Sequence, residues 1–159
     1  MIRVLFVCLG NICRSPTAEG VFRHQLAEAG LEELVEIDSC GITDWHQGKA
    51  PDQRSQVAAA ARGVDISGLK ARQLVAADFD RFDYVLAMDH DNLAAMQALR
   101  SADSPARTGL FLAYAGKPDM PVPDPYYGGA EGFEEVLDLI EAASRGLIDE
   151  IRGRLDSRQ

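Results

Sequence analysis

A buried strand that runs directly into a helix lies at the start of the chain, and it limits the folds that are possible. Residues 2–7 are almost entirely apolar, which is typical of a short buried strand. Residues 17–29 carry apolar side chains at helical spacing instead. Between these segments, Ser15 is a good helix N-cap and Pro16 suits the first helical position. The pattern predicts a strand, a tight loop, and a helix whose N-terminus faces that loop.

Strands and helices alternate along the rest of the chain. Further strands are expected at 34–39, 83–88 and 109–114, helices at 53–62, 89–99 and 130–155, and a short helical turn at 76–81. Residues 116–129 are rich in proline and glycine and are expected to lack regular structure. This alternation predicts an α/β domain over residues 1–159, with a parallel sheet covered by helices on both faces. Ligands of such sheets bind beyond the carboxyl ends of the strands.

The loop at residues 8–16 has the residue types of an anion-binding site. Backbone N–H groups at a helix start are unpaired, and the helix dipole favours negative charge there. Gly10 and Asn11 tolerate the left-handed backbone angles of a tight loop. If the loop curls around a tetrahedral anion, Arg14 can bind two of its oxygens and Cys8 lies below its central atom. This predicts a thiolate nucleophile aimed at phosphorus, the alternative being a strand-end cysteine and a surface arginine.

Charge and composition argue against several other classes of function. Sixteen basic residues stand against 25 acidic ones, a net charge of -9 that is unsuited to a nucleic-acid partner. No apolar run reaches the length of a membrane span and the start of the chain lacks a signal-peptide pattern, so we expect a cytoplasmic protein without membrane contact. Three cysteines do not suggest a disulfide framework, and the scattered histidines do not suggest a metal site. No cofactor is expected, and no nucleotide P-loop string occurs.

The loop residues also carry a resemblance to a known family. Residues 8–16, together with Ala18 and Glu19, resemble the N-terminal phosphate loop of the low-molecular-weight protein tyrosine phosphatases. The resemblance extends over essentially the whole chain and implies a four-stranded parallel sheet in the order 2-1-3-4. It implies hydrolysis of phosphotyrosine through a cysteinyl-phosphate on Cys8, with the phosphate bound by Arg14 and the loop amides. The other loop residues that would contact substrate are Leu9, Gly10, Asn11, Ile12, Cys13 and Ser15.

The segment at residues 122–129 supplies the second candidate group. Attack on a phosphate monoester expels an alkoxide or phenoxide, which needs a proton from a neutral acid on the opposite side. Two prolines frame Asp124, and a following glycine pair lets the segment act as a lid. The segment resembles the general-acid loop of the family, which implies that Asp124 is the acid and that Tyr126 and Tyr127 form an aromatic wall. Asp119 is a rival carboxyl, and an ordinary surface turn is the alternative for the whole segment.

Further positions match the family, and one departs from it. Residues 44–46 resemble a second loop of the family in which Trp45 forms the other wall of the cleft, the alternative being a half-buried packing tryptophan. Ser39 stands where the family has a serine that supports the loop asparagine, here Asn11. Leu69 stands where many members have a histidine that joins this network, so that hydrogen bond is expected to be missing.

Three alternative functions are considered. Arsenate reductases of the same scaffold need a further cysteine pair, but only Cys40 lies beyond the loop. Related protein-arginine phosphatases carry a threonine where this chain has Ile12, whose larger apolar side chain favours a phenyl ring. A phosphate-binding module without turnover would need neither Cys8 nor Asp124.

Partners and regulation follow from the same reasoning. The resemblance implies a phosphotyrosine protein as substrate, with a tyrosine kinase as one candidate, and inorganic phosphate as product. We expect a monomer or a weak dimer. A thiolate is also the form that peroxide attacks, and Cys13 lies five positions after Cys8 in a loop that must curl. This predicts a reversible Cys8–Cys13 disulfide, the alternative being that Cys13 is a small apolar filler.

Overall fold

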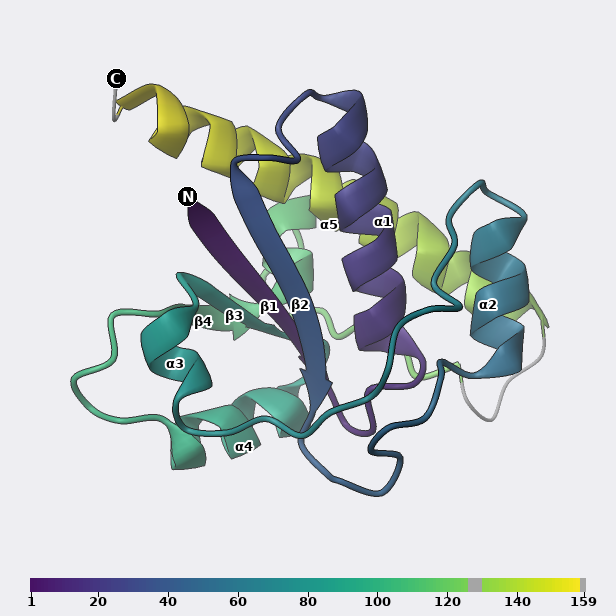
Figure 1. Cartoon of the computed structure of the whole chain (residues 1–159), viewed down its shortest axis with the longest axis horizontal. Coiled ribbons are helices and arrows are strands. Elements are labelled where there is room, and N and C mark those ends of the chain that lie inside the picture. Colours follow the sequence, from purple (N-terminus) through teal and green to yellow (C-terminus); the bar gives the residue numbers. More distant parts are fainter. Residues whose placement is uncertain (126–129, 158–159) are drawn as a thin grey trace.

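Four parallel strands form the centre of the protein in the computed structural model, which describes residues 1–125 and 130–157. The strands are β1 (Ile2–Cys8), β2 (Val35–Gly41), β3 (Tyr84–Ala87) and β4 (Arg107–Leu110), in the order β2-β1-β3-β4 (Figure 1). This confirms the predicted fold class and strand order. β1 pairs with β2 along its whole length and with β3 on its other side, which explains why its sequence is a continuous apolar run.

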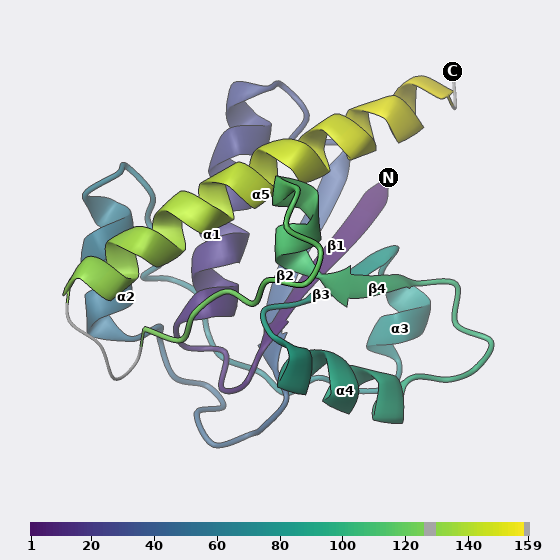
Figure 2. The ribbon, with the colours of Figure 1, turned by 180° about the vertical axis from the view of Figure 1, so that it is seen from behind.

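Helices cover both faces of this sheet, as predicted. α1 (Arg14–Glu28) and α5 (Ala130–Ser157) pack on one face, and α3 (Asp78–Arg81) and α4 (His90–Leu99) pack on the other (Figures 1 and 2). α2 (Gln53–Ala60) packs against α1 and α5. Within residues 1–125 and 130–157, no helix is both long and apolar enough to cross a membrane.

The prediction of a strand at residues 109–114 is wrong in its extent. β4 ends at Leu110, and Phe111–Ala115 form a 3-10 helix, η1, where the sequence analysis expected strand to continue to residue 114. The physical reason lies in the packing, because Phe111 and Leu112 are fully buried in the core that the sheet forms with α1 and α5. A short apolar run does not distinguish a strand from a helical segment, and here the contacts with α5 decide.

The start of α1 also differs from the prediction. The helix begins at Arg14 instead of Pro16, and Cys13 occupies the N-cap position without a capping side chain. Ser15 lies inside the helix and is not its N-cap. Its hydroxyl is hydrogen-bonded to side chains of the preceding loop instead. The helix N-terminus nevertheless faces that loop, at the carboxyl end of β1, which is where a ligand of a parallel sheet is expected.

Candidate active site

The loop that follows β1 lies flat against the end of β2. The carbonyl oxygens of Cys8 and Leu9 accept hydrogen bonds from the backbone N–H groups of Ile42 and Thr43, at 2.9 and 3.0 Å. Gly41, the last residue of β2, makes this approach possible. A Cβ there would lie 2.9 Å from the carbonyl oxygen of Leu9 and 3.0 Å from the backbone nitrogen of Asn11. The loop is therefore packed backbone to backbone on the sheet edge.

The two residues expected to adopt left-handed angles behave differently. Asn11 has a φ of 57°, which confirms the prediction for this residue. Gly10 does not adopt a positive φ, so the prediction is wrong for this residue. A Cβ at position 10 would lie 2.9 Å from Cδ2 of His46, a contact that a shift of the His46 side chain would have to relieve.

The carboxamide of Asn11 organises the loop from below. Its Nδ2 group donates to Ser15 Oγ at 2.7 Å and to Ser39 Oγ at 3.0 Å. Its Oδ1 accepts from the backbone N–H of Arg72 at 3.0 Å. These bonds use both amide hydrogens and the oxygen, although Leu69 contributes none of them and instead packs against the apolar core. The carboxamide therefore has partners for both its donors and its acceptor without a side chain from position 69.

Cys8 lies at the bottom of the loop and is almost fully buried. Its Sγ is 3.0 Å from Ser15 Oγ and accepts from the backbone N–H of Asn11 at 3.3 Å. Because Asn11 Nδ2 donates to Ser15 Oγ, the Ser15 proton is left to point at Cys8 Sγ or at the more distant carbonyl of Cys40, at 3.3 Å. Donors aimed at the sulfur are the arrangement that supports a thiolate nucleophile.

Arg14 is held in place by groups from two other elements. Its Nη1 donates to Asp89 Oδ2 and to the carbonyl oxygen of Val122, both at 2.9 Å. Its Nη2 lies 3.8 Å from Asp124 Oδ2. Asp89 also caps α4, because its Oδ1 accepts from the backbone N–H of Asn92 at 2.7 Å. The sequence analysis missed Asp89, although an aspartate between a strand end and a helix start on the ligand side of the sheet was a usable signal.

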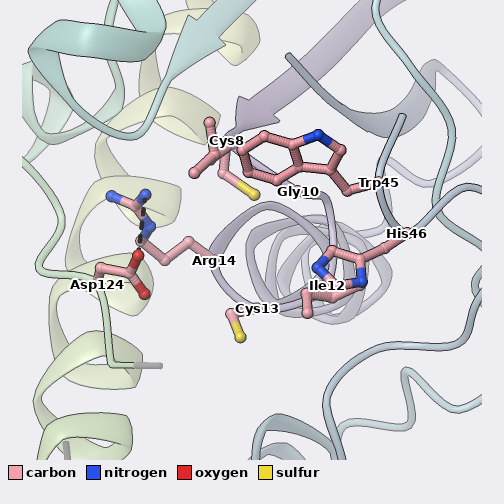
Figure 3. Close-up of a pocket in the computed structure, with 9 residues that line it drawn as sticks. Cys8, Gly10, Ile12, Cys13, Arg14, Trp45, His46 and Asp124 are labelled. Carbon is pink, nitrogen blue, oxygen red and sulfur yellow. Dashed lines mark ion pairs between the residues drawn. The ribbon is translucent and has the colours of Figure 1, made fainter. Parts of the chain in front are cut away.

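These groups line one cavity of about 190 Å³ (Figure 3). The lining residues are Cys8, Leu9, Gly10, Ile12, Cys13, Arg14, Trp45, His46 and Asp124. Trp45 is 69% exposed, so it is not a half-buried packing residue. Of the two rival carboxyls, Asp124 belongs to this lining and Asp119 does not. His46 was not singled out by sequence reasoning, and Tyr126 and Tyr127 lie outside the described residues.

All three cysteines are free, buried thiols, but they differ in position. Cys13 lines the same cavity as Cys8, and burial raises the pKa of its thiol to about 12. Burial also raises the pKa of Cys40, which packs in the apolar cluster on the other face of the sheet from Cys8. Cys13 and Cys40 are therefore neutral thiols near pH 7.

Comparisons with known proteins agree with this geometry. The sequence profile of the family described as low molecular weight phosphotyrosine protein phosphatase matches residues 3–157. A low molecular weight protein-tyrosine-phosphatase of Streptomyces coelicolor is 45% identical, over 98% of this chain and 97% of the relative. A crystal structure of a protein tyrosine phosphatase of Entamoeba histolytica, with Hepes in its active site, superposes with a TM-score of 0.91 at 35% identity and covers 96% of this chain and 98% of its own. A Drosophila arginine phosphatase superposes with a TM-score of 0.87 at 31% identity, covering 95% of this chain and 98% of its own.

The fold is a parallel α/β sheet with a buried thiol at the carboxyl end of its first strand, in the lining of a cavity. The chain belongs to the low molecular weight phosphotyrosine protein phosphatase family, and it is an enzyme of the protein-tyrosine-phosphatase class.

Proposed function

We propose that the chain hydrolyses phosphotyrosine in proteins in two steps, with Cys8 as nucleophile. The single observation that carries this proposal is that Cys8, Arg14 and Asp124 line one cavity beside a helix N-terminus. An anion seated in the loop would meet the amides of the loop and the guanidinium of Arg14. This local attraction is needed because the chain as a whole has a net charge of -9 and repels phosphate.

In the first step, the Cys8 thiolate attacks phosphorus and the bond from phosphorus to the tyrosine oxygen breaks. Asp124 gives its proton to the departing oxygen, so that tyrosine leaves as the neutral phenol. In the second step, Asp124 takes a proton from a water molecule that attacks the cysteinyl-phosphate. Inorganic phosphate forms and the thiolate of Cys8 is released, where the hydroxyl of Ser15 at 3.0 Å can donate to it.

The shape of the cavity favours an aromatic phosphate. Ile12 contributes an apolar side chain to the lining, and Trp45 stands exposed beside it. Tyr126 and Tyr127 are proposed as the facing wall on the family resemblance alone. The main alternative is phosphoarginine, since an arginine phosphatase is among the structural neighbours. We favour phosphotyrosine because the apolar Ile12 suits a phenyl ring better than a guanidinium.

The proposed substrate is a phosphotyrosine protein, with a tyrosine kinase as one candidate. We further propose a cytoplasmic location, supported by three cysteines that are all free thiols.

Two variants test the mechanism. Cys8→Ser is expected to abolish hydrolysis of an aryl phosphate while the protein still binds inorganic phosphate. Asp124→Asn is expected to lose most activity on phosphotyrosine and much less on an aryl phosphate with a very acidic leaving group. The matched control is Asp119→Asn, which removes a carboxyl outside the cavity lining. Activity within tenfold of wild type in Cys8→Ser would refute the covalent mechanism. Equal loss on both substrates in Asp124→Asn would assign the acid to another residue.

A further inference from the structure

Arg72 connects three parts of the molecule that meet behind the phosphate loop. Its carbonyl oxygen accepts from the backbone N–H of Gly41 at 2.8 Å, so its segment extends the sheet edge beyond β2. Its guanidinium donates to Asp38 of β2 at 3.0 Å. It also makes a bidentate pair with Asp78, at 3.0 and 3.1 Å. Two bonds to one carboxylate and a third to another fix both the position and the plane of the guanidinium.

The partners of this guanidinium are themselves fixed. Asp78 is only 5% exposed, and its Oδ2 also accepts from the backbone N–H of Val75 at 2.9 Å. Asp38 lies on β2 in register with β1. The preceding residue, Ala71, pairs with the segment after Trp45, because its carbonyl accepts from Gly48 N at 2.7 Å. The backbone at Arg72 is therefore held on both sides, and its N–H group has a defined direction.

That N–H group faces the carboxamide of Asn11. A backbone N–H can only donate, so the group that it meets at 3.0 Å must be the Oδ1 oxygen of Asn11. The Nδ2 group of Asn11 is then forced to face Ser15 and Ser39. Since Ser15 Oγ accepts from Asn11, its own proton is directed away from Asn11, with Cys8 Sγ as its nearest acceptor at 3.0 Å. Arg72 thus sets the orientation of the Asn11 carboxamide, and the Ser15 proton is left two acceptors, Cys8 Sγ at 3.0 Å and the carbonyl oxygen of Cys40 at 3.3 Å.

We propose that Arg72 is a positioning residue for the nucleophile, acting through Asn11 and Ser15 on Cys8. The inference rests on the proposed role of Cys8. Among the described residues that line the cavity Arg72 is absent, and Arg14 is bound by Asp89, Val122 and, at 3.8 Å, Asp124. Loss of the guanidinium therefore disturbs the hydrogen bond to sulfur more than it disturbs the phosphate contacts of Arg14.

The test compares Arg72→Ala with Arg81→Ala. Arg81 is a matched control, because it also pairs with a carboxylate of β2, Glu36, at 2.6 Å, while its guanidinium lies over the ring of Phe82, away from the loop. With an aryl phosphate as substrate, Arg72→Ala is expected to lower kcat about tenfold, the scale of a sub-ångström misplacement at a reacting group, with KM and inhibition by inorganic phosphate changed about twofold or less. Arg81→Ala is expected to leave kcat at the wild-type value. Arg72→Lys is expected to fall between Arg72→Ala and wild type, and it serves as the second variant if Arg72→Ala does not fold.

A double mutant identifies the route of the effect. Asn11→Gly keeps a residue that accepts the φ of 57° and removes the carboxamide. If Arg72 acts through Asn11, adding Arg72→Ala to Asn11→Gly lowers kcat no further. A purely structural role would lower the unfolding temperature of Arg72→Ala without this loss of kcat. Losses that multiply in the double mutant, or a kcat of Arg72→Ala within twofold of wild type, would overturn the inference. Wild-type activity that survives Cys8→Ser would instead overturn the proposed function.

Discussion

Gly41 is the residue at which the structure makes its sharpest prediction about the loop. An alanine Cβ at this position would lie 2.9 Å from Leu9 O and 3.0 Å from both Asn11 N and Gly10 C. All three are backbone atoms, so no side-chain rotation can relieve the contact. Ordinary contact begins near 3.4 Å, so restoring it separates the loop and the end of β2 by up to 0.5 Å, the difference between 3.4 and 2.9 Å.

This displacement has a functional and a structural consequence. Reacting groups must be held to within about 0.5 Å, and a misplacement of about 1 Å costs on the order of 100-fold in rate. If the logarithm of the rate falls in proportion to the displacement, a displacement of about 0.5 Å lowers kcat by about tenfold. Overpacking of this kind also destabilises a protein by about 1–3 kcal/mol. We therefore expect Gly41→Ala to remain folded at 25 °C, with a lower unfolding temperature and a clearly reduced kcat.

Steady-state kinetics on an aryl phosphate, combined with thermal unfolding, measure both effects. Gly109→Ala is the matched control, because Gly109 is also a strand glycine and no described residue lies within 4 Å of the Cβ that the substitution adds. It is expected to keep the wild-type kcat. A kcat for Gly41→Ala within twofold of the control would show that the loop tolerates the displacement, and the reasoning from backbone contact would be refuted.

Three further predictions concern side chains of the cavity. Arg14→Lys should lose most activity in steady-state assays. Nη1 of the Arg14 guanidinium already binds Asp89 and Val122, and a single ammonium cannot make these bonds and also contact phosphate as the planar guanidinium does. Near-normal activity of Arg14→Lys would contradict this reasoning. Ile12→Thr should shift the ratio of phosphotyrosine to phosphoarginine hydrolysis toward phosphoarginine, and a wild-type protein that already prefers phosphoarginine would exclude the Ile12 argument. After brief peroxide treatment, dithiothreitol should restore activity to wild type but not to Cys13→Ser, and intact mass should show the loss of two hydrogens in wild type alone. Because the pKa of Cys13 is raised to about 12, its thiolate fraction grows as pH rises from 7, and disulfide closure should become faster in that direction.

The fold was largely predictable because its signals are local. The apolar run of β1 and the helical spacing of α1 are properties of neighbouring residues, and the structure places both elements close to the expected bounds. The strand order came from the family resemblance. The segment at Phe111 and Leu112 could not be assigned in the same way, because a short buried run has no periodicity and its conformation depends on packing against α5.

The site was predictable only where its residues lie together in the sequence. Cys8 and Arg14 belong to one loop, so their spacing indicated their chemistry. Asp89 and Arg72 are 75 and 61 positions away from the loop residues that they bind. Their contacts depend on the sheet bringing distant segments to one edge; the position of Asp89 between a strand end and a helix start was a usable signal, whereas no local pattern marks Arg72. The roles of Tyr126 and Tyr127 stay predictions.

Gly10 and Gly41 show why residue type alone gave an incomplete reason for the shape of the loop. Sequence reasoning assigned Gly10 to backbone conformation, since glycine is the residue that tolerates left-handed angles. In the structure, it is Asn11 that takes the positive φ; its carboxamide donates two hydrogen bonds and accepts a third. The absence of a Cβ matters most at Gly41, where it would meet the loop backbone; at Gly10 it would meet the side chain of His46, which can shift. Close backbone approach at Gly41 therefore limits the path of the loop, and the bonds of Asn11 fix the orientation of its carboxamide beside Ser15 and Cys8.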